Sequence, residues 1–286
     1  MGTKLSNKYQ SSARTADAAG LAAAVLAGVL LVITLFAAGF AACASPQATR
    51  AFSGAFADFD TAPYLPQDLV ELAVATRDYT VEDCGRASSG VERAREPFAQ
   101  LLVESARRAA ASDSPVQNRW DAQALAILQD ENLTNSEAAY ALAQLDERYG
   151  LTEDALSHLD DCYALIGGVI PWLVGIAVVA LALIVGLIAS GRRRFAGNVL
   201  FFSPIALAAF MAVCGAWAAV DFNGFFGVFH ALLFPQGNWT FPADSLLICM
   251  LPLNFWVSMG ALWLAVTVLA CIIAMLIGRH LKRLAG

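Results

Sequence analysis

The stretch Ala164 to Ser190, ALIGGVIPWLVGIAVVALALIVGLIAS, carries no charged side chain. A helix needs roughly 20 apolar residues to cross the ~30 Å hydrocarbon core of a bilayer, and this stretch is longer than that. Three others meet the same requirement, namely Ala18 to Ala44, Val199 to Val220 and Phe255 to Gly278. The composition agrees, since 58% of the 286 residues are hydrophobic and 15% are charged. The sequence therefore predicts an all-α, polytopic membrane protein with four transmembrane helices.

The charged residues predict the orientation of these helices. Nine of the 18 basic residues fall at three short sites, which are Lys4, Lys8 and Arg14, then Arg192 to Arg194, then Arg279, Lys282 and Arg283. The segment 45–163 contains the other nine together with 21 of the 24 acidic residues, a net charge of −12. Because short basic loops are retained in the cytoplasm, residues 1–17, 191–198 and 279–286 are predicted inside, and segments 45–163 and 221–254 outside. Spans without ionisable side chains argue against a pump or a secondary transporter.

The N-terminus permits a second interpretation, a cleaved signal peptide. Its basic residues resemble an n-region, and Ala42-Cys43-Ala44 offers small residues for cleavage. The apolar run 18–44 is, however, longer than the usual apolar region of about 7–15 residues in a signal peptide. We therefore expect an uncleaved first span.

The six cysteines do not define a disulfide framework in a chain of this length. Cys214 and Cys271 lie in predicted spans, whereas the other four lie at or beyond the outer surface. A bridge such as Cys84 to Cys162 is chemically permitted there, although the sequence alone does not pair them. Unpaired cysteines are the expectation.

Helical spacing and turn signals divide the outer segment 45–163 into short helices. The predicted elements are helices at 66–79, 97–111, 115–129 and 134–150, and a loop at 84–90. Pro97 is expected to begin the second of these helices, and Ser114-Pro115 provides a cap and a first-turn proline for the third. Thr134-Asn135-Ser136-Glu137 fits a capping box, and Gly150 is expected to end the fourth helix.

The chain from Leu151 onward contains the first candidate functional residue. Thr152 is a suitable N-cap, and no proline or glycine intervenes between Glu153 and Ile166, so one helix should run into the second span. At about 1.5 Å per residue, His158 then stands roughly 10 Å from the apolar boundary, at headgroup depth. Asp161 follows on the same helix face, where its carboxylate could orient or charge-stabilise the imidazole. The alternative is a solvated acidic helix end that happens to contain a histidine.

The segment 221–254 contains the second candidate, His230. Glycines and prolines break this segment too often for a span, yet it is rich in Phe and Trp, so we predict a loop at the outer membrane interface. The third histidine, His280, lies among basic residues of the inner face and is expected to be a spectator. Two histidines at one depth predict a site for proton transfer, because histidine titrates near neutral pH. The alternative for His230 is an interfacial loop residue without a catalytic role.

Other chemistries have weaker signals. His158, Asp161 and His230 could together bind a metal, but they come from two segments without an H-x-x-x-H spacing, and we predict no metal. The sequence contains no G-x-S-x-G, no phosphate-binding loop and no C-x-x-C. Nothing therefore indicates a serine hydrolase, a thiol redox site, or a nucleotide or nucleic-acid partner.

Two motifs resemble one family. L-S-H-L-D-D, from Leu156 to Asp161, resembles the H-[ML]-x-D signature of the bacterial lipoprotein intramolecular transacylase (Lit) family. F-H-A-L-L-F-P-Q-G-N-W-T-F, from Phe229 to Phe241, looks like the F-H-x-x-F-F-x-x-x-x-W-x-F loop of that family. The four-span order is similar too. Two features depart from the family, because Cys162-Tyr163 replaces the common Val-Lys and the segment 85–150 looks like an insertion.

The resemblance implies an enzyme at the outer leaflet of the bacterial cytoplasmic membrane. Such an enzyme moves the sn-2 acyl chain of a diacylglyceryl-cysteine lipoprotein to the α-amino group of that cysteine, which yields the lyso form. It implies His158 and His230 as the catalytic pair, diacylglyceryl lipoproteins as substrate and membrane lipids as surroundings.

The residues suggest roles for this reaction without fixing which histidine does what. His230 would act as general base, and His158 with Asp161 behind it as proton donor or oxyanion stabiliser, although the two roles could be exchanged. Neither cofactor nor covalent enzyme intermediate is expected. The predicted substrate-binding residues, which would wall the site or anchor it at the interface, are Phe229, Phe234, Trp239 and Phe241. The alternative function is a non-catalytic interaction or envelope-sensing protein that uses the acidic outer segment.

Overall fold

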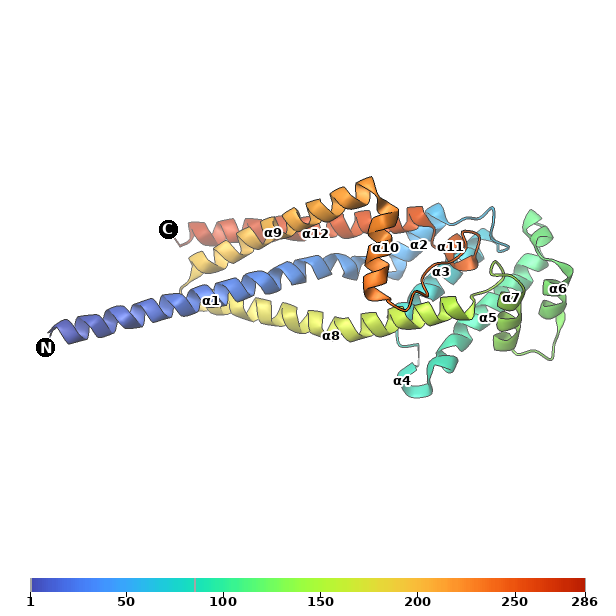
Figure 1. Ribbon diagram of the computed structural model, residues 1–286, viewed down its shortest axis with the longest axis horizontal. Coiled ribbons are helices and arrows are strands. Elements are labelled where there is room, and N and C mark those ends of the chain that lie inside the picture. Colours follow the sequence, from blue (N-terminus) through green and yellow to red (C-terminus); the bar gives the residue numbers. More distant parts are fainter. Residues whose placement is uncertain (1, 85, 286) are drawn as a thin grey trace. The chain divides into compact units, whose positions relative to one another are not determined.

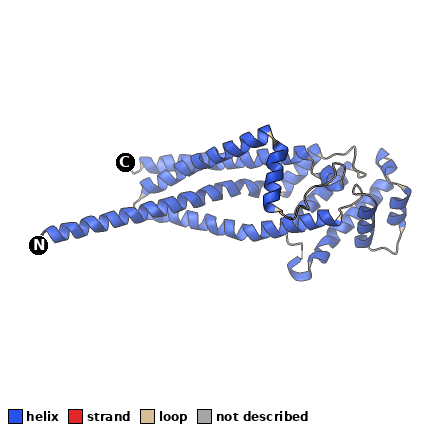
Figure 2. Cartoon of the chain, in the orientation of Figure 1, coloured by secondary structure: helices blue, strands red, loops and turns tan. Residues whose placement is uncertain are grey.

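The computed structural model describes residues 2–84 and 86–285, with residues 2–17 and 89 described by their backbone alone. The described residues form helices, with no strand among them (Figure 2). Four of these helices are long and apolar enough to cross a membrane: α1 (Gly2–Cys43), α8 (Glu153–Ala189), α9 (Arg193–Val220) and α12 (Leu253–Arg283). The prediction of an all-helical protein with four membrane-spanning helices is thus confirmed.

The shorter helices come in two groups. Those between α1 and α8 are α2 (Pro46–Phe56), α3 (Pro66–Val81), α4 (Arg86–Ser89), α5 (Val91–Ala110), the 3-10 helix η1 (Pro115–Arg119), α6 (Ala122–Gln129) and α7 (Asn135–Leu145). Those between α9 and α12 are α10 (Phe222–Leu233) and α11 (Leu246–Met250). The chain divides into two compact units, of which unit 1 contains residues 1–41, 169–225 and 263–286, and unit 2 contains residues 42–168 and 226–262.

Unit 1 is a bundle of four apolar helices. The start of α1 and the end of α12 lie at the same end of this bundle (Figure 1), as an even number of crossings requires. Its interior contains small and branched residues such as Ala27 and Leu207. A Cβ added to Gly278 would lie 2.8 Å from the carbonyl oxygen of Gly197, so α9 and α12 approach closely through glycine.

The outward faces of unit 1 are strongly apolar. Trp172 is 76% exposed, Val213 is 72% exposed and Leu181 is 63% exposed. A soluble monomer rarely exposes apolar surface on this scale, whereas lipid chains would cover it. The exposed faces therefore support a membrane location for this bundle.

Unit 2 has one hydrophobic core, to which both of its chain segments contribute. Leu72, Leu102 and Leu142 of the first segment and Leu246 and Met250 of the second are each at most 1% exposed. Residues 226–252, which precede α12, are therefore part of the same packed body as the helices between α1 and α8.

Aromatic side chains fix the connection that leads into α8. The Tyr64 hydroxyl donates a 2.6 Å hydrogen bond to the carbonyl oxygen of Tyr149. Trp120 stacks on the Tyr149 ring at 4.8 Å between centroids and meets Tyr64 edge-on at 5.5 Å. These contacts hold the turn that precedes the first candidate histidine.

The capping box at Thr134 is confirmed, because the Thr134 hydroxyl and the Glu137 carboxylate each accept a hydrogen bond from the backbone N–H of the other residue. The predicted end of that helix at Gly150 is wrong, since α7 ends at Leu145. Asp146 adopts an extended backbone, and its carboxylate accepts hydrogen bonds from the backbone and guanidinium of Arg148. Gly150 serves close packing instead, because a Cβ there would lie 3.0 Å from the Cβ of Ala143.

Three other element predictions need correction. Pro97 lies inside α5 rather than at its start, and the predicted loop at 84–90 contains the short helix α4. The predicted third helix is divided into η1 and α6, because Asp121 caps α6 with its own carboxylate. The segment 221–254 is not loop throughout, because α10 and α11 form within it.

Candidate functional site

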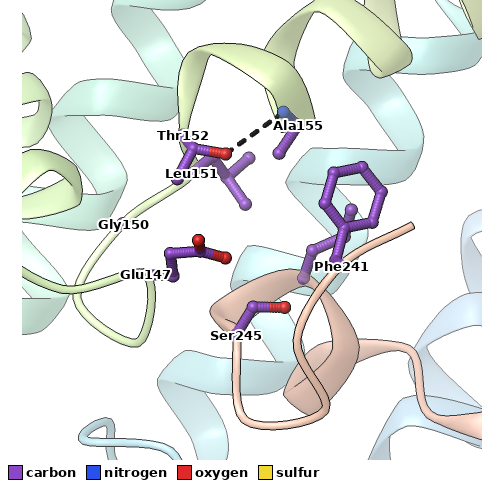
Figure 3. Close-up of a pocket in the computed structure, with 8 residues that line it drawn as sticks. Glu147, Gly150, Leu151, Thr152, Ala155, Phe241 and Ser245 are labelled. Carbon is purple, nitrogen blue, oxygen red and sulfur yellow. Dashed lines mark hydrogen bonds between the residues drawn. The ribbon is translucent and has the colours of Figure 1, made fainter. Parts of the chain in front are cut away.

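Helix α8 positions the first histidine. The Thr152 hydroxyl accepts a 3.3 Å hydrogen bond from the backbone N–H of Ala155 (Figure 3), which caps the helix start as predicted. The helix then continues without interruption to Ala189. His158, in its second turn, precedes the apolar stretch and is 9% exposed.

Helix α10 positions the second histidine. The Asp221 carboxylate accepts a 2.8 Å hydrogen bond from the backbone N–H of Gly224, which starts the helix despite its glycines. His230 Nδ1 donates a 2.9 Å hydrogen bond to the carbonyl oxygen of Phe226 one turn earlier. A neutral His230 with its proton on Nδ1 has an unprotonated Nε2, which is the form that a general base requires.

The two histidines lie beside one another within unit 2. Their ring centroids are 6.2 Å apart, with 35° between the planes. The third histidine, His280, belongs to unit 1. Residues separated by more than seventy positions in the sequence thus form one pair of imidazoles.

Each of the four predicted aromatic residues lies against a histidine. Phe234 is 4.8 Å and Phe241 is 5.8 Å from the His158 ring, between centroids. Phe229 and Trp239 are each 5.3 Å from the His230 ring. Phe226, which the sequence analysis did not single out, lies closest of all to His230, at 3.8 Å. The pair is therefore surrounded by aromatic rings.

Asp161 contacts the loop after α10 rather than the imidazole. Its Oδ2 accepts hydrogen bonds from Gln236 Nε2 at 2.6 Å and from Asn238 Nδ2 at 2.9 Å. Among the described residues, His158 Nδ1 is buried without a partner and Nε2 lies 3.6 Å from Cys162 Sγ. Asp161 therefore does not orient the ring by a hydrogen bond, and its charge only partly opposes the lowering of the His158 pKa by burial.

The comparison with known families covers this part of the chain. Residues 130–256 match the family model of lipoprotein intramolecular transacylase Lit. The matched range contains both histidines, Asp161 and the four aromatic residues, so the resemblance seen in the sequence is confirmed there. No curated protein and no solved structure was found to match the chain. The Lit match supports lipoprotein transacylase activity in general, and helices α2 to α6 lie outside it.

Both histidines of the segment that matches the Lit model, residues 130–256 (the Lit segment), are electrically neutral near pH 7. Burial lowers the pKa of His158 from 6.5 to about 4, the charge of His230 acts in the same direction, and Asp161 opposes both. Burial also lowers the pKa of His230, and the hydrogen bond to Phe226 opposes this. A neutral imidazole has one nitrogen that can accept a proton and one N–H that can donate, so each ring can serve as a base or as a hydrogen-bond donor.

Cys162 of the Lit segment contacts His158 but is poorly suited to be a nucleophile. Burial and the Asp161 charge raise the pKa of its thiol to about 12, so the thiol keeps its proton. A protonated thiol can donate to His158 Nε2, which places the ring proton on the unpartnered Nδ1. Among the described residues, Cys84, Cys162, Cys214, Cys249 and Cys271 form no disulfide.

A small cavity borders the aromatic wall of the Lit segment (Figure 3). It measures about 10 Å³ and is lined on one side by Phe241 and on the other by Glu147, Thr152 and Ser245. This volume is close to the minimum that holds one water molecule, so the cavity does not accommodate an acyl chain. The described residues also contain no group of three His, Cys, Asp or Glu placed to hold a metal ion.

Sequence reasoning missed Gln236, Asn238 and Cys162 as residues of this site. Cys162 follows His158 by one helical turn, which was a usable signal. The amides gave no comparable signal, because only the folded loop brings them to Asp161.

Proposed function

We propose that this protein catalyses acyl transfer within a single lipoprotein molecule, from the sn-2 position of its diacylglyceryl-cysteine to the α-amino group of that cysteine, giving the lyso form. The observation that carries the proposal is the pair of imidazoles 6.2 Å apart, one buried and one half-buried, inside the segment that matches the Lit family. The aromatic rings around this pair suit an apolar acyl substrate.

The reaction needs one proton relay. The α-amino nitrogen attacks the sn-2 ester carbonyl carbon, a tetrahedral centre forms, and its bond to the glycerol oxygen breaks while the amide bond remains. The amine loses one proton and the departing glycerol oxygen gains one, so neither water nor a redox partner is consumed. An α-amino group with a pKa of about 7.7 to 8.0 is partly neutral at physiological pH, so the base has modest work to do.

The hydrogen bonds support a division of labour between the histidines. His230 donates from Nδ1 to Phe226, which leaves Nε2 to take the proton of the amine and return it to the leaving oxygen. The proton of His158 on Nδ1 would be directed at the oxyanion, because Cys162 occupies its Nε2. Since both reacting groups belong to one molecule, much of the rate advantage comes from holding them in contact.

In this proposal Asp161 acts as a latch, which means that it holds the loop after α10 in place by hydrogen bonds. Its two hydrogen bonds to Gln236 and Asn238 hold the loop that carries Trp239 against α8. Phe229, Phe234, Trp239 and Phe241 then form the walls along which acyl chains bind. We place this site at the outer leaflet of the bacterial cytoplasmic membrane, with both termini and the loop 191–198 in the cytoplasm, because the basic residues outside unit 2 cluster there.

The test is mass spectrometry of lipopeptides after incubating a diacylglyceryl lipoprotein with membranes that contain the protein. The wild type should yield an N-acyl, S-monoacylglyceryl product, and His158→Asn and His230→Asn should each lower its rate by about 100-fold or more, the usual contribution of a positioned acid or base. His280→Asn is the matched control and should retain the wild-type rate.

Absence of acyl transfer by a correctly inserted wild type would refute the proposal. Equal activity of all three histidine variants would refute the catalytic pair but leave the family assignment of the segment. In the first case the acidic helices between α1 and α8 would become the candidate functional surface, as a binding module.

A further inference from the structure

Asp160, two residues after His158, is the centre of a charged cluster on the other side of α8. Its Oδ1 accepts hydrogen bonds from the Tyr79 hydroxyl at 2.5 Å and from Arg86 at 2.8 Å. Its Oδ2 accepts one from Arg95 at 2.7 Å. Two successive steps of about 100° along a helix place Asp160 on the face opposite His158. One helix therefore presents the imidazole to the site and this carboxylate to α3, α4 and α5.

Arg86 is the most buried charged side chain of the cluster, whereas Asp160 and Arg95 are each 23% exposed. The Arg86 side chain is 6% exposed and lies between two rings, at 3.9 Å from the Tyr79 centroid and 4.0 Å from that of Tyr163. Its Nη1 also donates to the carbonyl oxygen of Tyr79 at 2.6 Å. A planar guanidinium that is stacked between rings and bonded to a carboxylate has a fixed orientation and a fixed position.

The partners of Asp160 come from outside the Lit match. Tyr79, Arg86 and Arg95 belong to α3, α4 and α5, whereas the match begins at residue 130. Arg95 also reaches Glu153 at 3.0 Å, one turn before His158. Arg86 and Arg95 belong to the segment that looks like an insertion in the sequence. This segment thus holds α8 at Glu153, before His158, and at Asp160, after it.

We propose that Asp160 is a positioning residue for transacylation, through which the helices α3 to α5 set the place of His158 against His230. This inference rests on the proposed function. Removing the carboxylate leaves the buried guanidinium of Arg86 without its charge partner, and such a charge forces its surroundings to rearrange. A displacement of about 1 Å at a reacting group can lower a rate about 100-fold, so the effect should appear in turnover rather than in substrate binding.

The test compares Asp160→Asn with Asp68→Asn in the full-length protein in membranes. Asp68 also forms an ion pair with an arginine, Arg108 at 2.9 Å, and this pair joins α3 to α5. The Asp68 side chain is 7% exposed, whereas Arg108 is 47% exposed. Asp160→Asn should lower kcat about tenfold or more with KM within about twofold, Asp160→Glu should restore part of the rate, and Asp68→Asn should keep kcat within about twofold.

A second measurement does not depend on activity. Cys162 touches His158 at 3.6 Å, so the rate at which iodoacetamide alkylates this thiol, read peptide by peptide by mass spectrometry, follows the packing of this part of α8. The rate should rise several-fold in Asp160→Asn and stay unchanged in Asp68→Asn. Tyr79→Phe removes one hydrogen bond of the cluster while keeping the stacked ring, and it should give a smaller rise, which provides a test if Asp160→Asn does not fold.

Two outcomes would overturn the inference. One is an active Asp160→Asn variant with the kcat of Asp68→Asn, and the other is an equal alkylation rate of Cys162 in wild type, Asp160→Asn and Tyr79→Phe. If the wild type transfers no acyl chain, the proposed function fails by itself, and the alkylation rates still decide whether Asp160 positions the histidine helix.

Discussion

Replacing Asp161 and Asn238 by alanine, singly and together, separates two roles for the Asp161 carboxylate. Asn238 Nδ2 lies 2.9 Å from Asp161 Oδ2 and 3.3 Å from the Ser157 hydroxyl oxygen. If the carboxylate acts by latching the loop, both substitutions break the same contact. If it acts on His158 directly, they have separate effects.

The structure sets the size of the expected coupling. A hydrogen bond to a charged group contributes about 1.5–3 kcal/mol, and because both residues are only half-buried the lower end applies. About 1.5 kcal/mol corresponds to roughly a tenfold change in rate. Each single variant should therefore lower kcat/KM about tenfold. The double variant should have a kcat/KM close to that of the less active single variant, rather than about 100-fold below wild type.

The assay is the rate of N-acyl product formation at low substrate concentration for the four proteins of the cycle. Thr240→Ala, an exposed change in the same loop, is the control and should remain within about 0.5 kcal/mol of wild type. Multiplicative losses in the double variant would refute the latch. The Asp161 carboxylate would then act on His158 through its charge alone.

Three further predictions concern pH and stability. The slope of log kcat/KM against pH should be one below the amine pKa and become two only below pH 6.5, because burial keeps His230 neutral to lower pH; a second break above pH 6.5 would contradict this. Tyr64→Phe should lower the free energy of unfolding by about 1–3 kcal/mol, since the buried carbonyl of Tyr149 loses its donor, and a thermal melt of the purified protein measures this. Gly278→Ala should cost about 1–3 kcal/mol because its methyl group meets the backbone of the facing helix, while Gly215→Ala, with no atom within 4 Å, should not lower the melting temperature.

The four long helices could be predicted because the composition of each apolar run is enough to identify it as a span. An apolar run without charge identifies a span whatever its neighbours are, and the continuous α8 followed from Thr152 and the lack of breakers before Ile166. The capping box at Thr134 is likewise a local signal between two residues of one turn. Local signals of this kind survive folding unchanged.

Errors arose where tertiary contacts decide the local structure. Pro97 is tolerated inside α5 because Ala94 is buried and Arg95 is bonded to Asp160, so the turns before the proline are held from outside the helix. In α10 the glycines suggested a loop, yet the Asp221 carboxylate caps the helix start. Neither contact is visible in the spacing of residues along the chain.

The residues of the site could be predicted from the sequence, but the hydrogen bonds between them could not. The two histidines and their aromatic neighbours stand out because the chain contains only three histidines and one aromatic segment outside the spans. The partner of Asp161 could not be foreseen, since helical spacing favoured His158 and only the folded loop supplies the amides of Gln236 and Asn238. Spacing shows which groups share a face, and it does not show which of them a third segment will reach.

The two-segment core of unit 2 also sets an order in time. The chain leaves this unit after Gly168 and returns at Phe226, and these roughly 60 residues take on the order of 3–12 s to synthesise at about 5–20 residues per second. Until then the helices between α1 and α8 have left the ribosome without Leu246 and Met250, both 0% exposed in the finished core. The nascent protein thus carries an unfilled apolar surface for seconds, and its histidine pair cannot assemble before most of the chain has been made.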